Sequence, residues 1–181
     1  MNAKEVFERE WALYRQGAAQ GAFVADNAKN AAKGEFDGDV KVGEYRIFAD
    51  MKRPFVALIV EGRGLSGWQI VPVSPFTVPA SPREMLVGER VLQLWNSCVA
   101  SRRFVERSWR VDSVSEDDLA DVKARMSVVV PGLIAAGVGA VAKYEKAFLV
   151  SGGNFAPLVE ASRRGLWGSG GATEGGALLR C

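Results

Sequence analysis

The sequence contains no histidine among its 181 residues. This absence excludes Ser-His-Asp triads, histidine-based acid–base catalysis and most zinc sites, all of which need imidazole. The two cysteines, Cys98 and Cys181, do not have the spacing of a metal-binding pair. A disulfide between them remains open, but the sequence favours reduced thiols in a cytoplasmic protein. No metal and no other cofactor is expected.

Strong net charge and long apolar runs are also lacking. The formal net charge is only +2, so any basic surface for nucleic acid must be local. The first residues, MNAKEVFEREW, are charged throughout and predict no signal peptide. The longest uncharged run, residues 126–142, reaches the lower limit of a membrane-spanning helix, but an early Pro-Gly step favours two buried pieces. No membrane span is therefore expected.

Periodic patterns divide the chain into three parts. Residues 1–40 predict a helical extension, because Phe7, Trp11 and Tyr14 recur at helical spacing. That aromatic face would pack on the rest of the protein or, alternatively, recruit another protein. Residues 41–131 predict a β-rich domain with a C-terminal helix, and residues 132–181 predict a helical extension with a flexible, Gly-rich tail.

The middle part contains four apolar runs that are separated by turn residues. They are EYRIFAD, RPFVALIVEG, GWQIVPVS and ERVLQLWNSCVA. The stretch EGRGLSGW predicts a hairpin loop, and three prolines make residues 75–84 an irregular connection. Ser115 followed by Asp118 predicts a capped helix that packs through Leu119, Val122 and Met126. The expected fold is mainly β with added helices (α+β): a small, mostly antiparallel barrel of five or six strands from about residue 42 to 109.

Four stretches in this part carry a family resemblance through their order and spacing. They are VGEYRIF, RPFVALIV, IVPVSPFT and SVSEDDLADVKARMSVVV, within about residues 42–131. Together they resemble the MazF/PemK family of toxin endoribonucleases. The resemblance implies an SH3-like barrel that forms a homodimer and cleaves single-stranded RNA without a metal. It also implies attack by a 2′-hydroxyl that leaves a cyclic phosphate, and an acidic antitoxin as partner.

The resemblance assigns catalytic roles to Arg53, in the Arg-Pro step, and Ser74, in the Val-Pro turn. A guanidinium can hold a phosphate with two hydrogen bonds and stabilise developing charge, and a hydroxyl can donate a further bond. Arginine is a poor general base because its pKa exceeds about 12. Glu61 and Glu84 could supply a base only if the fold brings them near.

Further candidate contacts to RNA combine basic, polar and aromatic side chains. They are Lys52, Thr77, Trp95, Asn96, Arg102 and Arg103. Each candidate also has a plainer interpretation. Arg53 could be a surface residue at a strand entrance, and the Ser74 hydroxyl could cap its own backbone. Trp95 and Asn96 could be a core aromatic and a turn former, and ASRRFVERSWR could be an edge strand protected by its charges.

Some features depart from the family pattern. The first strand-to-strand loop is only ADMK, and Asn96 stands where the family commonly has an acidic residue. The extensions before residue 40 and after residue 131 are also atypical. These departures favour an alternative hypothesis, in which the barrel is a non-catalytic binding or regulatory module.

Overall fold

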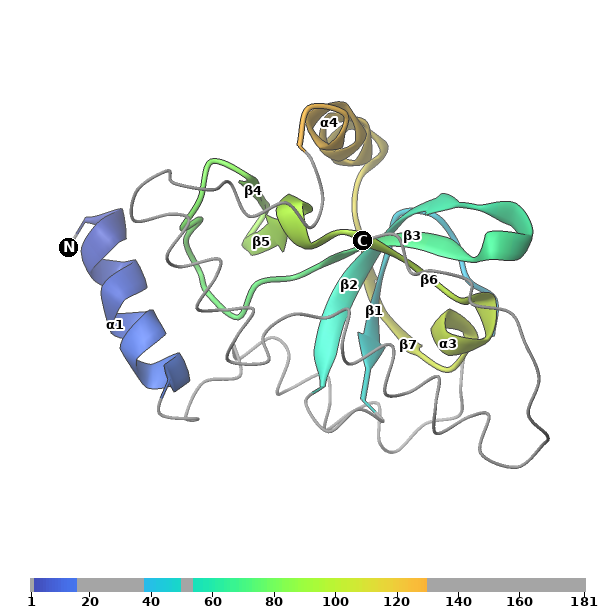
Figure 1. The fold of residues 1–181 in the computed structure, drawn as a ribbon, viewed down its shortest axis with the longest axis horizontal. Coiled ribbons are helices and arrows are strands. Elements are labelled where there is room, and N and C mark those ends of the chain that lie inside the picture. The colour runs from blue at the N-terminus through green and yellow to red at the C-terminus, as the bar shows by residue number, and fades with distance from the viewer. Residues whose placement is uncertain (1, 16–37, 50–53, 130–181) are drawn as a thin grey trace, which may run out of the picture.

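The computed structural model of the chain describes residues 2–15, 38–49 and 54–129 (Figure 1). These residues form a mixed α+β structure whose strands pair antiparallel, which confirms the predicted fold class at that level. The helices and strands, in chain order, are α1 (Ala3–Arg15), β1 (Glu44–Phe48), β2 (Phe55–Gly62), β3 (Trp68–Pro72), β4 (Glu84–Val87), β5 (Arg90–Gln93), β6 (Cys98–Ala100), α3 (Arg102–Glu106), β7 (Trp109–Ser113) and α4 (Glu116–Met126).

Two sheets make up the β structure. The larger has five strands in the order β6-β3-β2-β1-β7, and β4 and β5 form a separate hairpin. The hairpin meets the continuation of β3 through a bridge between Val73 and Leu92 and a 2.7 Å hydrogen bond from Ser74 N to Val91 O. Among the described residues, backbone hydrogen bonds do not close these sheets into a barrel.

Strand β2 is the centre of the structure, as its apolar run predicts. Its side chains alternate between two cores, because successive strand residues point to opposite faces. Val56 and Leu58 join the core that includes Val122 of α4, whereas Ala57 and Ile59 join the core beneath α3. Helices α3 and α4 thus lie on different sides of the five-stranded sheet (Figure 1), which is why β2 has no polar face.

Helix α4 begins where its capping sequence predicts. The Ser115 hydroxyl accepts a 3.1 Å hydrogen bond from the backbone N–H of Asp118. Val122 is fully buried, and Leu119 and Met126 pack beside it as partly buried side chains. This helix therefore packs on the sheet through the predicted face.

Two stretches differ from expectation. The stretch ASRRFVERSWR is not one edge strand: α3 precedes the edge strand β7, because Phe104 and Val105 are adjacent buried residues that a strand would point to opposite faces. The stretch ERVLQLWNSCVA is interrupted by a 3-10 turn, Leu94–Asn96, which carries the chain from the hairpin to the edge of the larger sheet. With five strands in the larger sheet and two in the hairpin, the described residues contain seven strands, whereas the predicted barrel had five or six.

Other expectations concern residues that the structure does not describe. The further helices and Gly-rich tail after residue 131, and Cys181, lie outside the described residues, whereas Cys98 is buried in β6. None of the helices within residues 2–15, 38–49 and 54–129 has the length and apolar character needed to cross a membrane.

The loop between β2 and β3 yields a prediction about stability. A Cβ atom at Gly67, where φ is +117°, would lie 2.0 Å from the carbonyl oxygen of Ala100. Because the clash is with backbone, Gly67→Ala should lower the free energy of unfolding by roughly 2–3 kcal/mol. Gly64 also has positive φ, but a Cβ there would meet nothing within 4 Å. Gly64→Ala is the matched control and should cost about 1 kcal/mol in urea denaturation; equal losses would contradict the prediction.

Candidate functional site

The candidate site lies at the edge of the sheet where β2 begins and β3 ends. Ala57 of β2 pairs with Pro72 of β3 in antiparallel register, and Val73 N donates a 2.8 Å hydrogen bond to Val56 O. Phe55 and Ser74 each lie two residues beyond the Ala57–Pro72 pair, so they mark the same edge. The candidate catalytic residue Arg53 and the neighbouring Lys52 precede Pro54 and the start of β2 in the sequence, and both lie outside the described residues.

Ser74 is built into a turn. Its side chain is 5% exposed, and its Oγ accepts a 3.2 Å hydrogen bond from the backbone N–H of Phe76. Pro75 has no N–H, so Phe76 is the first residue after Ser74 that can donate from its backbone. This geometry matches the interpretation of Ser74 as a turn-capping hydroxyl. The same hydroxyl still carries a proton that it can donate.

Thr77, at the end of this turn, is held by Glu10 of α1. One carboxylate oxygen of Glu10 accepts a 2.9 Å hydrogen bond from Thr77 N, and the other accepts a 2.6 Å hydrogen bond from Thr77 Oγ1. Two hydrogen bonds thus join Glu10 and Thr77, which are 67 positions apart in the sequence. Sequence reasoning missed Glu10, although it lies three residues after Phe7 on the same helical face.

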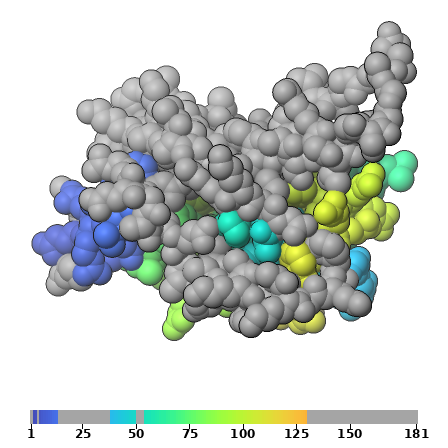
Figure 2. Space-filling view, turned by 90° about the horizontal axis from the view of Figure 1, so that it is seen from below, coloured from blue at the N-terminus to red at the C-terminus, as the bar shows by residue number. Residues whose placement is uncertain are grey.

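Aromatic packing holds α1 against the same turn. Phe76 is buried, and its ring makes edge-to-face contacts with Phe7 at 5.4 Å and Trp11 at 5.9 Å between centroids. Helix α1 lies at one end of the molecule (Figure 1), and its blue atoms occupy that end in the view from below (Figure 2). The predicted packing of the N-terminal aromatic face is confirmed for Phe7 and Trp11; the side chain of Tyr14 lies outside the described residues.

Trp95 and Asn96 lie beneath the turn as core residues. Trp95 is 1% exposed, packs with Phe76, and donates a 3.2 Å hydrogen bond from Nε1 to Glu84 Oε1. Asn96 is buried and donates from Nδ2 to Gln93 Oε1. In this state, the ring of Trp95 presents no face on which a base could stack.

The two candidate bases lie in different places. Glu84 is buried near the turn, where its other oxygen accepts a 2.6 Å hydrogen bond from Ala80 N. Glu61 lies six residues along β2 from Phe55, which is roughly 20 Å at the rise of an extended strand. It pairs there with Arg63 at 2.9 Å, and both side chains are about half exposed. The structure thus brings Glu84, but not Glu61, toward the Ser74 edge.

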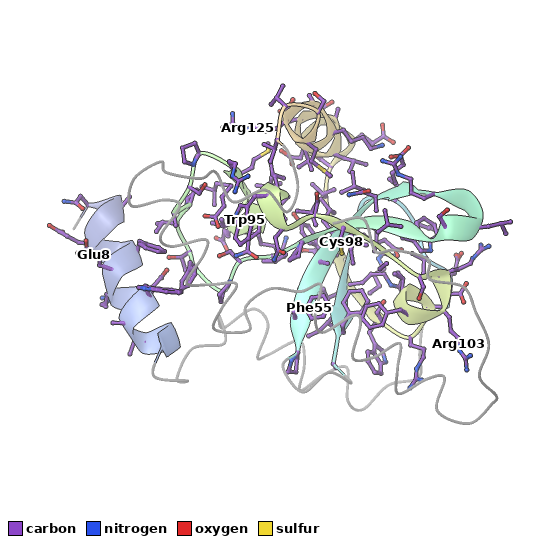
Figure 3. All side chains as sticks on the ribbon, in the orientation of Figure 1. Glu8, Phe55, Trp95, Cys98, Arg103 and Arg125 are labelled. Carbon is purple, nitrogen blue, oxygen red and sulfur yellow. The ribbon has the colours of Figure 1, made fainter. Side chains whose placement is uncertain are left out.

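Arg102 and Arg103 lie on the exposed side of α3. Arg102 pairs with Glu106 one helical turn later at 3.1 Å, and Arg103 projects from α3 on the side of the sheet where Phe55 also lies (Figure 3). A stack of three parallel rings connects these regions: Phe48 lies 4.6 Å from Phe55 and 4.8 Å from Phe104 between centroids. The stack links the beginning of β2 to α3.

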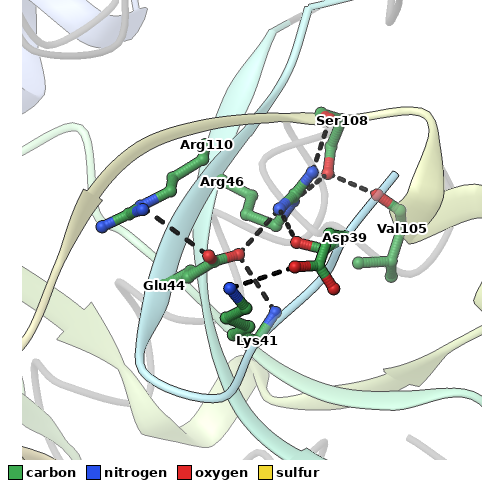
Figure 4. Close-up of polar contacts among 7 residues, drawn as sticks. All are labelled: Asp39, Lys41, Glu44, Arg46, Val105, Ser108 and Arg110. Atoms are coloured by element: carbon green, nitrogen blue, oxygen red, sulfur yellow. Dashed lines mark hydrogen bonds and ion pairs between the residues drawn. The ribbon is translucent and has the colours of Figure 1, made fainter. Parts of the chain in front are cut away.

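A buried charge cluster, which sequence reasoning also missed, lies around Glu44 and Arg46, toward the end of β1 that is opposite to Phe48 (Figure 4). Arg46 is fully buried and donates hydrogen bonds to Glu44 Oε2 at 2.7 Å, Ser108 O at 2.8 Å and Ser108 Oγ at 2.9 Å. Glu44 is also buried, and its Oε2 accepts a 3.1 Å hydrogen bond from Lys41 N. Because Arg46 in β1 binds both the carbonyl and the hydroxyl of Ser108, this cluster fixes the segment before β7 against β1.

Arg90 ties the β4–β5 hairpin to the larger sheet. Its guanidinium forms an ion pair with Asp112 of β7 and lies 4.6 Å from the ring centroid of Tyr45 in β1. Partial burial by itself would raise the pKa of Asp112, but hydrogen bonds from Ser113 N and Arg90, together with the positive charges of Arg90 and Arg110, lower it overall. Burial raises the pKa of the Tyr45 phenol. Side chains therefore connect β5 to β1 and β7.

Within the described residues, no cluster of three or more acidic or cysteine side chains is arranged to hold a metal ion. Comparison of the chain with protein-family models, curated proteins and solved structures finds no match.

Proposed function

We propose that the protein is an endoribonuclease that cleaves single-stranded RNA without a metal and acts as the toxin of a toxin–antitoxin pair. The observation that carries this proposal is the register of β2 and β3, which brings the start of β2, directly after Arg53 and Pro54, to the same edge as Ser74. This register supports the pairing that the MazF/PemK resemblance assigns to the scissile phosphate: Ser74 lies at the edge where β2 begins, and Arg53 precedes that beginning by two residues in the sequence.

The proposal includes an SH3-like barrel as the scaffold. Its support is the position of the β4–β5 hairpin, which contacts the end of β3 through Val73 and Leu92. The same hairpin reaches β7 through Arg90 and Asp112. In the larger sheet, β2 and β1 separate β3 from β7. One hairpin can contact both β3 and β7 only if the sheet curves strongly, as it does in a small barrel.

The proposed reaction needs no group that the chain lacks. The RNA 2′-hydroxyl gives its proton to solvent water as its oxygen attacks phosphorus, the bond from phosphorus to the 5′-oxygen breaks, and the 5′-oxygen takes up a proton from water. In this proposal Arg53 binds the phosphate and stabilises its developing charge, and Ser74 donates a hydrogen bond to it. A homodimer and an acidic antitoxin that covers the RNA-binding surface complete the proposal.

The product chemistry tests this function. The full-length chain should cut single-stranded RNA in the presence of EDTA and leave 2′,3′-cyclic phosphate and 5′-hydroxyl ends. The same sequence with 2′-O-methyl groups should stay intact, because its 2′-oxygen cannot attack. Product ends can be identified by mass spectrometry. Cleavage that EDTA abolishes, or equal cleavage of the methylated strand, would refute the proposal.

A second candidate is a non-catalytic binding module on the same scaffold. The observation that favours it is the coverage of the Ser74–Thr77 turn by α1. This candidate predicts that the chain binds single-stranded RNA or a protein partner but produces no cleavage products under any of the conditions above.

A further inference from the structure

We infer that the Thr77 turn is a phosphate-binding site and that Glu10 of α1 occupies it in place of the RNA backbone. This inference rests on the proposed function, because it takes RNA as the ligand of the site. Helix α1 is then an inhibitory segment within the same chain, and RNA binding requires Glu10 to leave Thr77.

The contact between Glu10 and Thr77 has the form of an anion-binding site. A backbone N–H and a hydroxyl from one residue each donate to a separate oxygen of one carboxylate, at 2.9 and 2.6 Å. Backbone N–H groups and threonine hydroxyls are common donors to the non-bridging oxygens of nucleic-acid phosphates. A carboxylate and a phosphodiester each carry one negative charge on two equivalent oxygens, so the same two donors can serve either group.

The position of Thr77 connects this site to the proposed chemistry. Thr77 follows Ser74 by three residues, and the two are joined through Phe76, whose N–H binds Ser74 Oγ. An RNA phosphate bound at Thr77 would therefore lie on the same turn as the proposed catalytic hydroxyl. Glu10 blocks that approach with a charge of the same sign as the RNA backbone.

The described contacts of α1 are suited to reversible binding. They centre on the Glu10–Thr77 pair and on Phe7 and Trp11 against Phe76. Thr77 is exposed, so water can replace either partner. A helix the length of α1 (Ala3–Arg15) is marginally stable by itself, and its position depends on these contacts. Loss of the Glu10 pair should therefore shift α1 away from the turn.

Binding of a 2′-O-methyl single-stranded RNA oligonucleotide to the full-length chain, measured by fluorescence anisotropy, tests the inference without cleavage. Glu10→Ala should tighten binding at least tenfold, because it frees the Thr77 donors and removes a competing anion. Glu89→Ala is the matched control, since it removes the same charge from an exposed turn of the β4–β5 hairpin; it should change affinity less than twofold. Adding Thr77→Val to Glu10→Ala should reverse most of the gain, because valine keeps the branched shape but loses the hydroxyl.

The outcomes separate this inference from the proposed function. Unchanged or weaker binding by Glu10→Ala, or an equal gain from Glu89→Ala, overturns the inhibitory role of Glu10. Full retention of the gain in the Thr77→Val double variant overturns the phosphate site. Ordinary RNA is then assayed with the same proteins. Tighter binding by Glu10→Ala without cleavage by any protein refutes the nuclease but supports the site, whereas equal kcat/KM for parent and Glu10→Ala supports the nuclease and refutes the inhibition.

Discussion

Replacing Arg46 with alanine should lower the free energy of unfolding by about 3–5 kcal/mol, the cost typical of breaking a buried ion pair from one side. The substitution leaves Glu44 buried without its 2.7 Å partner and leaves the Ser108 carbonyl without the 2.8 Å bond from Arg46. Both groups lose water on folding, and the bond from Lys41 N and the exposed Arg110 would compensate the Glu44 charge only in part. For a chain of this size, such a loss lowers the melting temperature by roughly 10 °C.

Arg110 provides the matched control for Arg46. It approaches the other oxygen of the same Glu44 carboxylate at 3.7 Å, but its side chain is 52% exposed. An exposed partner contributes little because water screens the charge and replaces the contact, so Arg110→Ala should cost less than about 1 kcal/mol. Urea denaturation of both variants gives the comparison, and equal losses would contradict the assigned role of Arg46.

A double substitution distinguishes the destabilisation caused by an unpaired buried charge from the net contribution of the ion pair to the free energy of unfolding. Replacing Arg46 with Met and Glu44 with Gln removes both charges while keeping similar side-chain volume. This variant should be more stable than Arg46→Ala, because no charge is left buried without a partner. A double variant that is as unstable as Arg46→Ala would indicate that lost packing, not the stranded carboxylate, dominates.

Replacing Arg53 with alanine should lower kcat/KM for single-stranded RNA by about a hundredfold or more, the effect typical of losing one preorganised donor to a transition state. In the proposed reaction, the guanidinium would stabilise charge that develops on the phosphate oxygens only as the 2′-oxygen attacks. Arg53→Lys should fall between the parent and the alanine variant, because an ammonium keeps the charge but cannot bind two oxygens side by side.

Arg63 is the matched control for Arg53, since it follows the opposite end of β2 and pairs with Glu61. Removing Arg63 takes away the same charge beyond the far end of β2, about 20 Å or more from Phe55, where the strand begins. Arg63→Ala should change kcat/KM less than threefold. Undiminished cleavage by Arg53→Ala, or an equal loss in Arg63→Ala, would remove Arg53 from the proposed catalytic site.

The sequence by itself determined the elements whose signals are local. The apolar run before Gly62 identified β2, the Ser115–Asp118 spacing identified the start of α4, and the aromatic period identified the buried face of α1. For the two helices, capping or side-chain spacing within four residues sets the conformation, and for β2 the unbroken apolar run matches a strand that is buried on both faces. Local turn chemistry likewise offered the alternative interpretation of Ser74, a hydroxyl that accepts a backbone hydrogen bond, and the structure shows that bond.

Tertiary structure alone decided the contacts that join distant residues. No local pattern shows that Arg46 would bind Ser108 across 62 positions, or that Glu10 would bind Thr77 across 67. It also decided that residues 102–106 form α3. The charged sequence is compatible with both a helix and an edge strand, and the helix is favoured because it buries Phe104 and Val105 in the same core. Buried charges and adjacent buried residues gain stability only from partners that the sheet register supplies, and that register depends on the whole domain.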